Sequence, residues 1–572
     1  MKKGIVAVFL IVIFAVVINV FNGEADYFAK EADDADIYLA KLVNDIAKTT
    51  NAGGLFVRID GALGESEEGS YLTDELFVMM SVSDMRERLG LDITENSDKE
   101  ITITQGISRM FLTIGDSGIR VNGQTVDIGK APEEKDGRIY LPVELLGSYL
   151  HYDTSLSVIN NTLDITKLEY EEELPKSYDL RAEKKVTPVR DQGKFGTCWA
   201  FASLGALETV TMPDDEEIYS VDHMNYMGGF NVDAVLGGDY TMAMSYLAGW
   251  YGPVLEKDDI YGDEKANERL LPVKHLEEAR LIPDKNYDRI KECLVLYGGV
   301  QTSIYISGEL ANLETDAGKN GNEFYDTEHS CYYYDGNNSP NHAVVIVGWD
   351  DDYPKSNFKK EPKENGAFIC KNSWGTDFGD QGFFYVSYED VNIGTVNIVY
   401  TALSDTSNYD SIYQSDKLGW VGQLGFDAES AYFANVYKAE DEEYLKAVGF
   451  YATDQNTRYS VYVVTDFTDK DSLVLGDELA SGEFSEAGYY TVRLDEAVKL
   501  DKNEKFAVVV YVNTPGAKRP VAVEYAAGAK TADADISDGE SYISLTADKW
   551  SNVEMSQGGN VCLKAYTDRK ED

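Results

Sequence analysis

The sequence predicts an α+β protein in which a core containing an apolar helix and buried strands stands between a small α/β repeat domain and a β-sandwich. An apolar run with helical texture begins at Cys198, and a short apolar run typical of a buried strand begins at His342. From residue 403 onward, alternating strand segments are separated by turns rich in Gly, Asp and Asn. A chain of 572 residues is too long for one core, so several domains are expected.

Composition indicates a globular and strongly acidic protein. Apolar residues make up 43% of the chain and aromatic residues 12%, which is enough to fill several cores. The net charge of −49, from 51 basic and 100 acidic residues, repels phosphate backbones. Nucleic acid is therefore not expected as a partner.

The cysteines predict neither a disulfide framework nor a zinc site. Five cysteines in a chain this long, without paired CxxC spacing, give no such pattern. Cys293 and Cys370 lie in apolar helical and strand-like runs and are expected in the core. No metal and no cofactor is expected.

Residues 1–25 differ from the rest of the chain. Lys2 and Lys3 precede an apolar run from Gly4 to Ile18, and small residues then occupy the positions that a signal peptidase reads, at Gly23 and Ala25. This pattern predicts an export signal cleaved after Ala25. The alternative is an uncleaved N-terminal membrane anchor, because the run is of marginal length for spanning a bilayer.

Residues 26–170 form the next predicted domain, which starts with a helix up to about residue 50. A repeat follows, in which a strand-like run leads into a short helical run, first over 78–89 and again over 139–150. Residues 55–167 resemble the small repeat domain named after the N-terminal region of copper amine oxidases. The resemblance implies a stalk or binding module, and the absence of a histidine cluster argues against copper.

Residues 171–402 contain a pattern typical of nucleophilic catalysis. Cys198 begins an apolar helical run, and the positive end of a helix stabilises a thiolate. His342, at the start of a strand-like run, can act as base and then protonate a leaving amine. Asn372 can accept a hydrogen bond from the imidazole and fix its orientation, while Gln192 can donate an N–H to a developing oxyanion. Trp374 can shield the His–Asn hydrogen bond from water.

These motifs, in this order, resemble those of the papain family of cysteine peptidases. The resemblance extends to Gly237 and Gly238, which match the family's cleft-lining glycines. It implies a papain-like two-lobed peptidase core with catalytic residues Cys198, His342, Asn372 and Gln192. The residues predicted to bind substrate are Gly237, Gly238, Trp374 and Asn341.

The chain also departs from the papain pattern. Phe195 and Leu236 stand where the family usually has two cysteines joined by a disulfide, so packing is expected to replace that link. The family's characteristic pro-region helix is not recognisable between residues 26 and 170. One hypothesis is that the N-terminal repeat domain covers the cleft instead.

Residues 403–572 form the last predicted domain. The segment from Tyr409 onward resembles the lectin-like domain attached to bacterial papain-type peptidases, which implies cell-surface carbohydrate as a partner. The sequence thus predicts an exported cysteine endopeptidase, extracellular or at the cell surface of a bacterium, that acts on protein or peptide substrates through an acyl-enzyme. The alternative is a catalytically silent adhesin or carbohydrate-binding protein on a peptidase fold. Oligomeric state is left open.

Overall fold

The structure is a computed structural model that describes residues 55–569 except 64–68, 74–76, 98, 106–107, 122–123, 151, 158–161, 169–173, 214, 309, 311–320 and 538. The predicted signal or anchor over 1–25 and the predicted helix over 26–50 lie outside the described residues. The chain divides into two compact units, the first ending at Glu171, apart from Asn96–Asp98, and the second running from Glu172. Of the helices described, none is long and apolar enough to cross a membrane.

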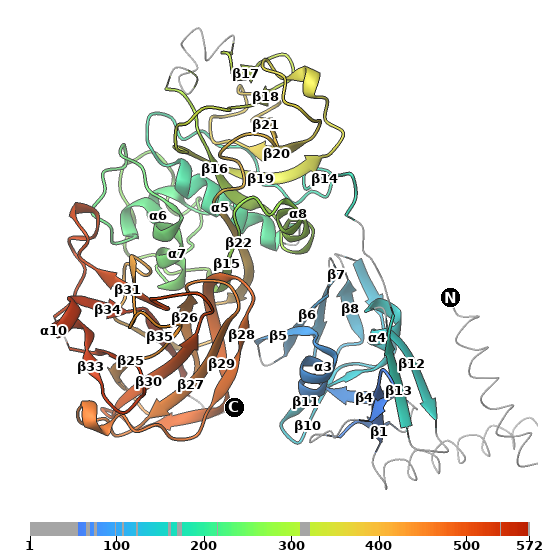
Figure 1. The fold of residues 1–572 in the computed structure, drawn as a ribbon, viewed down its shortest axis with the longest axis vertical. Coiled ribbons are helices and arrows are strands. Elements are labelled where there is room, and N and C mark those ends of the chain that lie inside the picture. The colour runs from blue at the N-terminus through green and yellow to red at the C-terminus, as the bar shows by residue number, and fades with distance from the viewer. Residues whose placement is uncertain are drawn as a thin grey trace, which may run out of the picture. The chain divides into compact units, whose positions relative to one another are not determined.

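The first unit contains both copies of the predicted strand–helix repeat (Figure 1). Strand β4 (Val78–Ser81) leads into α3 (Val82–Leu89), and β11 (Arg138–Pro142) leads into α4 (Glu144–Tyr149). The two copies meet because β4 and β11 pair antiparallel. The hydroxyl of Ser81 caps α3 by accepting from the backbone N–H of Asp84 at 3.0 Å.

The remaining strands of the first unit complete three small sheets, in the orders β12-β13-β1-β2, β10-β11-β4-β3 and β5-β6-β7-β8-β9. Their bounds are β1 (Phe56–Ile59), β2 (Ala62–Leu63), β3 (Tyr71–Leu72), β5 (Asp92–Ser97), β6 (Glu100–Gln105), β7 (Ser108–Thr113), β8 (Gly118–Val121), β9 (Gln124–Asp127), β10 (Glu133–Lys135), β12 (Tyr152–Ser157) and β13 (Thr162–Lys167).

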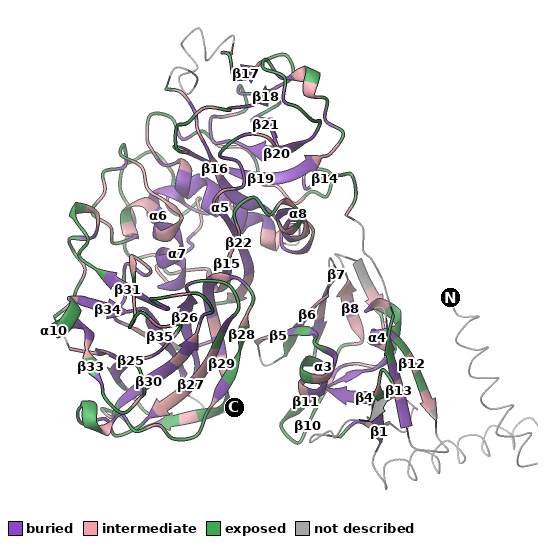
Figure 2. Cartoon of the chain, viewed as in Figure 1, coloured by how far each residue is buried: buried purple, intermediate pink, exposed green. Residues whose placement is uncertain are grey.

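The second unit begins with a helical lobe and a β lobe. Its helices are α5 (Cys198–Thr211), α6 (Val221–Met227), α7 (Tyr240–Ala248) and α8 (Tyr287–Leu296). Its strands are β14 (Ser177–Asp179), β15 (Lys274–Ile282), β16 (Val300–Ile304), β17 (Tyr325–Asp326), β18 (Cys331–Tyr332), β19 (His342–Asp350), β20 (Ala367–Lys371), β21 (Phe383–Ser387) and β22 (Asn397–Asp405). Helix α5 is largely apolar and is buried from Trp199 to Thr209, which makes it the central helix of this core (Figure 2).

The C-terminal part of the second unit is built on strands. These are β23 (Ser411–Gln414), β24 (Gly422–Leu424), β25 (Ser430–Lys438), β26 (Glu443–Ala452), β27 (Thr457–Val464), β28 (Ala480–Phe484), β29 (Ala487–Leu500), β30 (Lys505–Asn513), β31 (Val521–Tyr525), β32 (Ser541–Ser544), β33 (Ser551–Asn552), β34 (Gly559–Val561) and β35 (Leu563–Asp568), with a short helix α10 (Val553–Gln557). Two sheets enclose a core in which Phe433 and Val508 from one sheet meet Phe450 and Leu563 from the other. The predicted α+β class with a C-terminal β domain is confirmed.

One feature of the sheet differs from the expectation of independent domains. Strand β15 of the β lobe pairs antiparallel with β29 of the C-terminal part, so one 13-stranded sheet runs through both. Strand β22 also continues past residue 402 to Asp405, across the predicted boundary. Backbone hydrogen bonds between edge strands join the two parts, and the order of strands along the sequence does not reveal such pairing.

Candidate active site

Cys198 begins helix α5, at the end that carries partial positive charge. The residue before it, Thr197, does not cap the helix with its side chain; its hydroxyl lies 2.7 Å from the hydroxyl of Tyr261. Tyr261 in turn donates to the backbone carbonyl of Gln192 at 2.8 Å. Tyr261 therefore fixes the loop that precedes Cys198 through two hydrogen bonds. This keeps the Cys198 sulfur at the N-terminus of α5.

His342 and Asn372 come from two paired strands of the β lobe. His342 is the first residue of β19, and Asn372 directly follows β20, which pairs antiparallel with β19. The Nε2 atom of His342 lies 2.8 Å from Oδ1 of Asn372, in a buried position. This contact leaves Nδ1 as the ring nitrogen available to Cys198, with which the His342 side chain also hydrogen-bonds.

The environment of Cys198 favours the thiolate. Burial raises the pKa of the thiol, but the hydrogen bond and the charge of His342 act in the opposite direction. The backbone N–H groups of Ala343 and Trp199 add to this, and the net pKa lies below the usual range for cysteine.

The other four cysteines have pKa values shifted the opposite way. All five are free thiols, and Cys293, Cys331, Cys370 and Cys562 are buried. Burial raises the pKa of Cys293 and of Cys331 to about 12, and raises those of Cys370 and Cys562 well above the usual range. Cys198 is thus the single cysteine whose surroundings promote ionisation. Among the described residues, no group of three or more His, Cys, Asp or Glu side chains could hold a metal ion.

Trp374 covers the imidazole. Its ring centroid lies 4.7 Å from that of His342 at an angle of 32°, and the residue is only 7% exposed. A hydrogen bond under such a cover competes less with water and is strengthened accordingly.

Gln192 lies close to the nucleophile with its amide held at both ends. Its Nε2 donates to the backbone carbonyl of Phe195 at 2.7 Å, and its Oε1 accepts from the hydroxyl of Ser373 at 2.7 Å. Because a primary amide has two N–H groups, one remains for a developing oxyanion. Ser373 was not singled out from the sequence; its position between Asn372 and Trp374 is the signal that could have drawn attention to it.

Gly237 and Gly238 lie beside the loop of residues 192–197 that precedes Cys198, here called the nucleophile loop. Side chains at these two positions would not fit. Gly237 has a φ of +81°. A Cβ on Gly238 would lie 2.6 Å from the indole ring of Trp199, and a Cβ on Gly196 would lie 2.8 Å from the backbone nitrogen of Gly237. The backbone N–H of Gly196 also donates to the carbonyl of Ala234 at 2.8 Å. These close contacts join the two loops at the point where the sequence lacks a pair of cysteines.

Asn341 uses its side chain within the fold. Its Oδ1 accepts from the backbone N–H of Ile306 at 2.7 Å, and its Nδ2 donates to the carbonyl of the same residue at 2.9 Å. The side-chain amide therefore positions the chain that enters β19. A role in substrate binding stays a prediction, as do the roles of Gly237, Gly238 and Trp374.

A buried charge network behind the site was also missed. Lys371 donates to the hydroxyl of Thr187 at 2.8 Å, and that hydroxyl donates to the carboxylate of Glu208 on α5. Arg190 binds the same carboxylate at 3.0 Å. Burial lowers the pKa of Lys371 to about 8, against the attraction of Glu208. These residues link α5 to the segments around Arg190 and Asn372, and the scattered single charges show no motif in the sequence.

A thiol of lowered pKa, a buried imidazole and an orienting amide are the groups that cysteine-type peptidases use. Residues 174–403 match the family model of the papain family cysteine protease, residues 412–567 that of the lectin-like domain, and residues 65–165 that of the copper amine oxidase N-terminal domain. Residues 174–403 are therefore similar to the papain family of cysteine proteases.

Similar proteins agree with this assignment. Mouse cathepsin K is 29% identical over 243 residues, which cover 41% of this chain and 65% of cathepsin K. Falcipain-2a of Plasmodium falciparum is 25% identical over 270 residues, covering 43% of this chain and 51% of the relative. The chain thus spans less than two thirds of the length of these curated relatives.

Two solved structures resemble a larger part of the chain. The clostridial cysteine protease Cwp84 after propeptide cleavage is 26% identical, with a TM-score of 0.61, and covers 69% of this chain and 99% of its own. The cysteine protease and lectin-like domains of Cwp84, a surface layer associated protein of Clostridium difficile, are 25% identical, with a TM-score of 0.59 and coverage of 70% and 90%. This likeness extends over both the protease and the lectin-like parts.

Proposed function

We propose that this protein is an exported cysteine endopeptidase that hydrolyses peptide bonds of proteins at the cell surface of a bacterium. The observation that carries the proposal is the contact of Cys198 with His342, which lowers the pKa of this thiol while the pKa values of the other four are raised. A low-pKa thiol beside an oriented imidazole is the arrangement that thiol hydrolases require.

The proposed reaction proceeds in two stages. The Cys198 thiolate attacks the peptide carbonyl, and the oxyanion that forms accepts hydrogen bonds from the backbone N–H of Cys198 and the second N–H of Gln192. The imidazolium of His342 then gives its proton to the leaving amine, and a thioester joins the acyl group to the sulfur. In the second stage His342 removes a proton from water, which attacks the thioester and frees the thiol.

Asn372 and Ser373 support this chemistry without touching substrate. Asn372 holds the imidazole through Nε2, so that Nδ1 faces the sulfur throughout the cycle. Ser373 holds Oε1 of Gln192 and so orients the amide N–H groups. Both are positioning residues.

The proposed setting rests on two separate observations. The sequence of residues 1–25 predicts export, and the similar protein Cwp84 is described as surface-layer associated. The lectin-like domain supports binding to surface carbohydrate, which would bring the peptidase close to wall-associated proteins. The silent-adhesin alternative is not favoured, because the chain retains Cys198, His342, Asn372 and Gln192 and the pKa of the Cys198 thiol is lowered.

The test is hydrolysis of casein and of a dipeptide amide by the mature chain and by its Cys198→Ala variant. The proposal expects hydrolysis by the first alone, with unchanged thermal unfolding of both. Asn365→Ala, an exposed change in the β lobe, is the control for handling and expression. Equal hydrolysis by Cys198→Ala and the unaltered chain would contradict the proposal.

A further inference from the structure

The loop that carries Gly237 and Gly238 runs between α6 and α7 and is held on one side by the nucleophile loop. On that side the backbone of Gly196 donates to Ala234 at 2.8 Å and approaches Gly237 closely. Any force that moves this loop therefore also acts on the segment that directly precedes Cys198.

The C-terminal domain holds the same loop from its other side. The short 3-10 helix η3 (Ala529–Thr531) brings Lys530 against it, and the carbonyl of Lys530 accepts from the backbone N–H of Asn231 at 3.0 Å. The Lys530 ammonium lies 5.4 Å from the ring centroid of Phe230 and donates to the carboxylate of Asp239. One residue thus contacts the loop near its beginning and at its end.

Asp239 is the residue through which this contact reaches Gly238. It directly follows Gly238, and its carboxylate caps α7 by accepting from the backbone N–H of Thr241 at 2.9 Å. Burial raises the pKa of this carboxyl, but the hydrogen bonds from Lys530 and Thr241 outweigh burial and lower the pKa overall. The carboxylate is therefore charged and bound from two directions.

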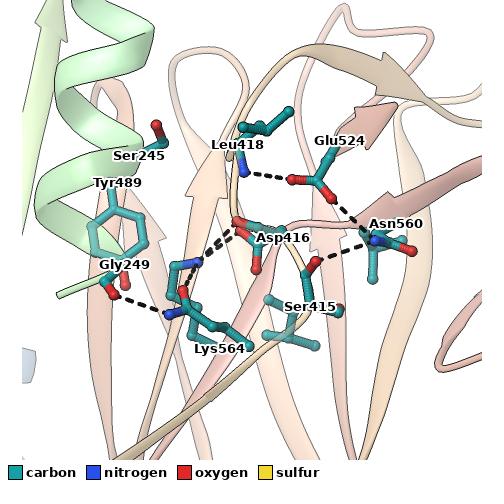
Figure 3. Close-up of polar contacts among 12 residues, drawn as sticks. Ser245, Gly249, Ser415, Asp416, Leu418, Tyr489, Glu524, Asn560 and Lys564 are labelled. Atoms are coloured by element: carbon teal, nitrogen blue, oxygen red, sulfur yellow. Dashed lines mark hydrogen bonds and ion pairs between the residues drawn. The ribbon is translucent and has the colours of Figure 1, made fainter. Parts of the chain in front are cut away.

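The C-terminal domain is attached to the peptidase part by further contacts, so it can hold the loop that carries Gly237 and Gly238 in place. Besides the pairing of β15 with β29, the amide of Gln414 donates to the carbonyl of Gly249 at the end of α7, at 3.0 Å. Figure 3 shows a buried ion pair between Lys564 and Asp416, whose distance is 2.9 Å, near Gly249. Lys564 also donates to Gln414 at 2.9 Å, so the charge pair stiffens the contact with α7.

We propose that Lys530 is a positioning residue, through which the lectin-like domain sets the backbone of Gly237 and Gly238 for binding of the substrate chain. This inference rests on the proposed peptidase function and adds a task for the C-terminal domain that does not involve carbohydrate. An extended substrate lies along the cleft by backbone hydrogen bonds, so a shift of the glycine loop weakens its binding. The chemical groups at Cys198 and His342 are not altered by such a shift.

The test compares charge reversal at two lysines of the same domain. Lys530→Glu places a second carboxylate next to Asp239, whereas Lys518→Glu reverses a lysine paired with Asp427, with both side chains more than three-quarters exposed. For a peptide amide substrate, Lys530→Glu is expected to raise KM about three- to tenfold with kcat within about twofold. Lys530→Arg is expected to restore the KM, and Lys518→Glu to leave it unchanged.

A second readout does not depend on turnover. The rate at which iodoacetamide alkylates Cys198 is expected to be the same in the unaltered chain and in the three variants. This small reagent does not bind to the loop that carries Gly237 and Gly238. The rate for a peptidyl chloromethyl ketone is expected to fall with Lys530→Glu alone. An unchanged ratio of the two rates, or an equal effect of Lys518→Glu, overturns the inference. If the unaltered chain hydrolyses nothing, the proposed function fails, and the two alkylation rates still decide the role of Lys530.

Discussion

His342 begins β19 and Asn372 directly follows the adjacent β20, and the two are joined by a hydrogen bond of 2.8 Å between Nε2 and Oδ1. Asn372→Ala removes the acceptor and lets the imidazole turn away from Cys198. We expect kcat for a peptide amide to fall about a hundredfold, at the lower end of what loss of acid–base catalysis costs. Asn365→Ala is the matched control, and a kcat within twofold of the unaltered chain for Asn372→Ala would remove this residue from the mechanism.

The pH dependence of thiol alkylation tests the contact between Cys198 and His342. Because this contact lowers the pKa of the thiol, the rate with iodoacetamide should reach its plateau at a lower pH than for free cysteine. His342→Ala should move the midpoint upward, since burial then acts without the opposing charge. A midpoint that stays in place in His342→Ala would show that the histidine does not stabilise the thiolate.

The same reagent tests the contrast among the five cysteines. In the folded protein at neutral pH, mass spectrometry should find rapid labelling at Cys198 alone, because the other thiols are buried and their pKa values are raised. In denaturant all five should react at similar rates. Rapid labelling of Cys293 or Cys370 in the native chain would contradict the described burial.

The site residues that lie within a local sequence motif could be predicted from the sequence. Cys198 begins an apolar helix and His342 begins an apolar strand, so their types and neighbours are informative on their own. Ser373 with Gln192, and Lys530 with Asp239, were not predictable in this way. Each of these contacts joins segments far apart in the chain, and a single hydroxyl or lysine has no periodic pattern around it.

For the fold as well, elements set by local sequence patterns could be predicted, whereas contacts between distant segments could not. Strand and helix patterns predicted the repeat units and the sandwich, because these depend on short-range patterns. The two lobes were implied by the resemblance to the papain family. The pairing of β15 with β29, which joins the lobes to the C-terminal domain, depends on which strand edges meet. Alternating apolar residues in each strand do not specify that choice.

Ser373 is expected to act through Gln192. Ser373→Ala removes the donor to Oε1, so the Gln192 amide loses a fixed orientation, and kcat should fall about tenfold with KM little changed. In the Gln192→Ala background, Ser373→Ala should have no further effect, because no amide remains to be oriented. Independent losses from the two changes would assign Ser373 a separate role.

The last prediction concerns Glu524, a fully buried residue next to the Lys564–Asp416 pair. Its carboxylate accepts from the backbone N–H of Leu418 and from Asn560 at 3.2 Å (Figure 3). Burial raises its pKa to about 7 from 4.5; the N–H of Leu418 opposes this shift, and the charge of Asp416 adds to it. Between these two values the folded protein holds a proton that the unfolded chain has lost, so the free energy of unfolding falls as pH rises.

Glu524→Gln removes this titration. The difference in free energy of unfolding between the unaltered chain and Glu524→Gln should therefore change by about 3 kcal/mol between pH 4.5 and pH 7 and stay constant above that, from urea unfolding at each pH. The slope with pH is the readout, because glutamine also alters the hydrogen bond with Asn560. Glu496→Gln, an exposed change in the same domain, should leave the profile unaltered. Parallel profiles for the unaltered chain and Glu524→Gln would mean that Glu524 is ionised throughout this range in the folded protein.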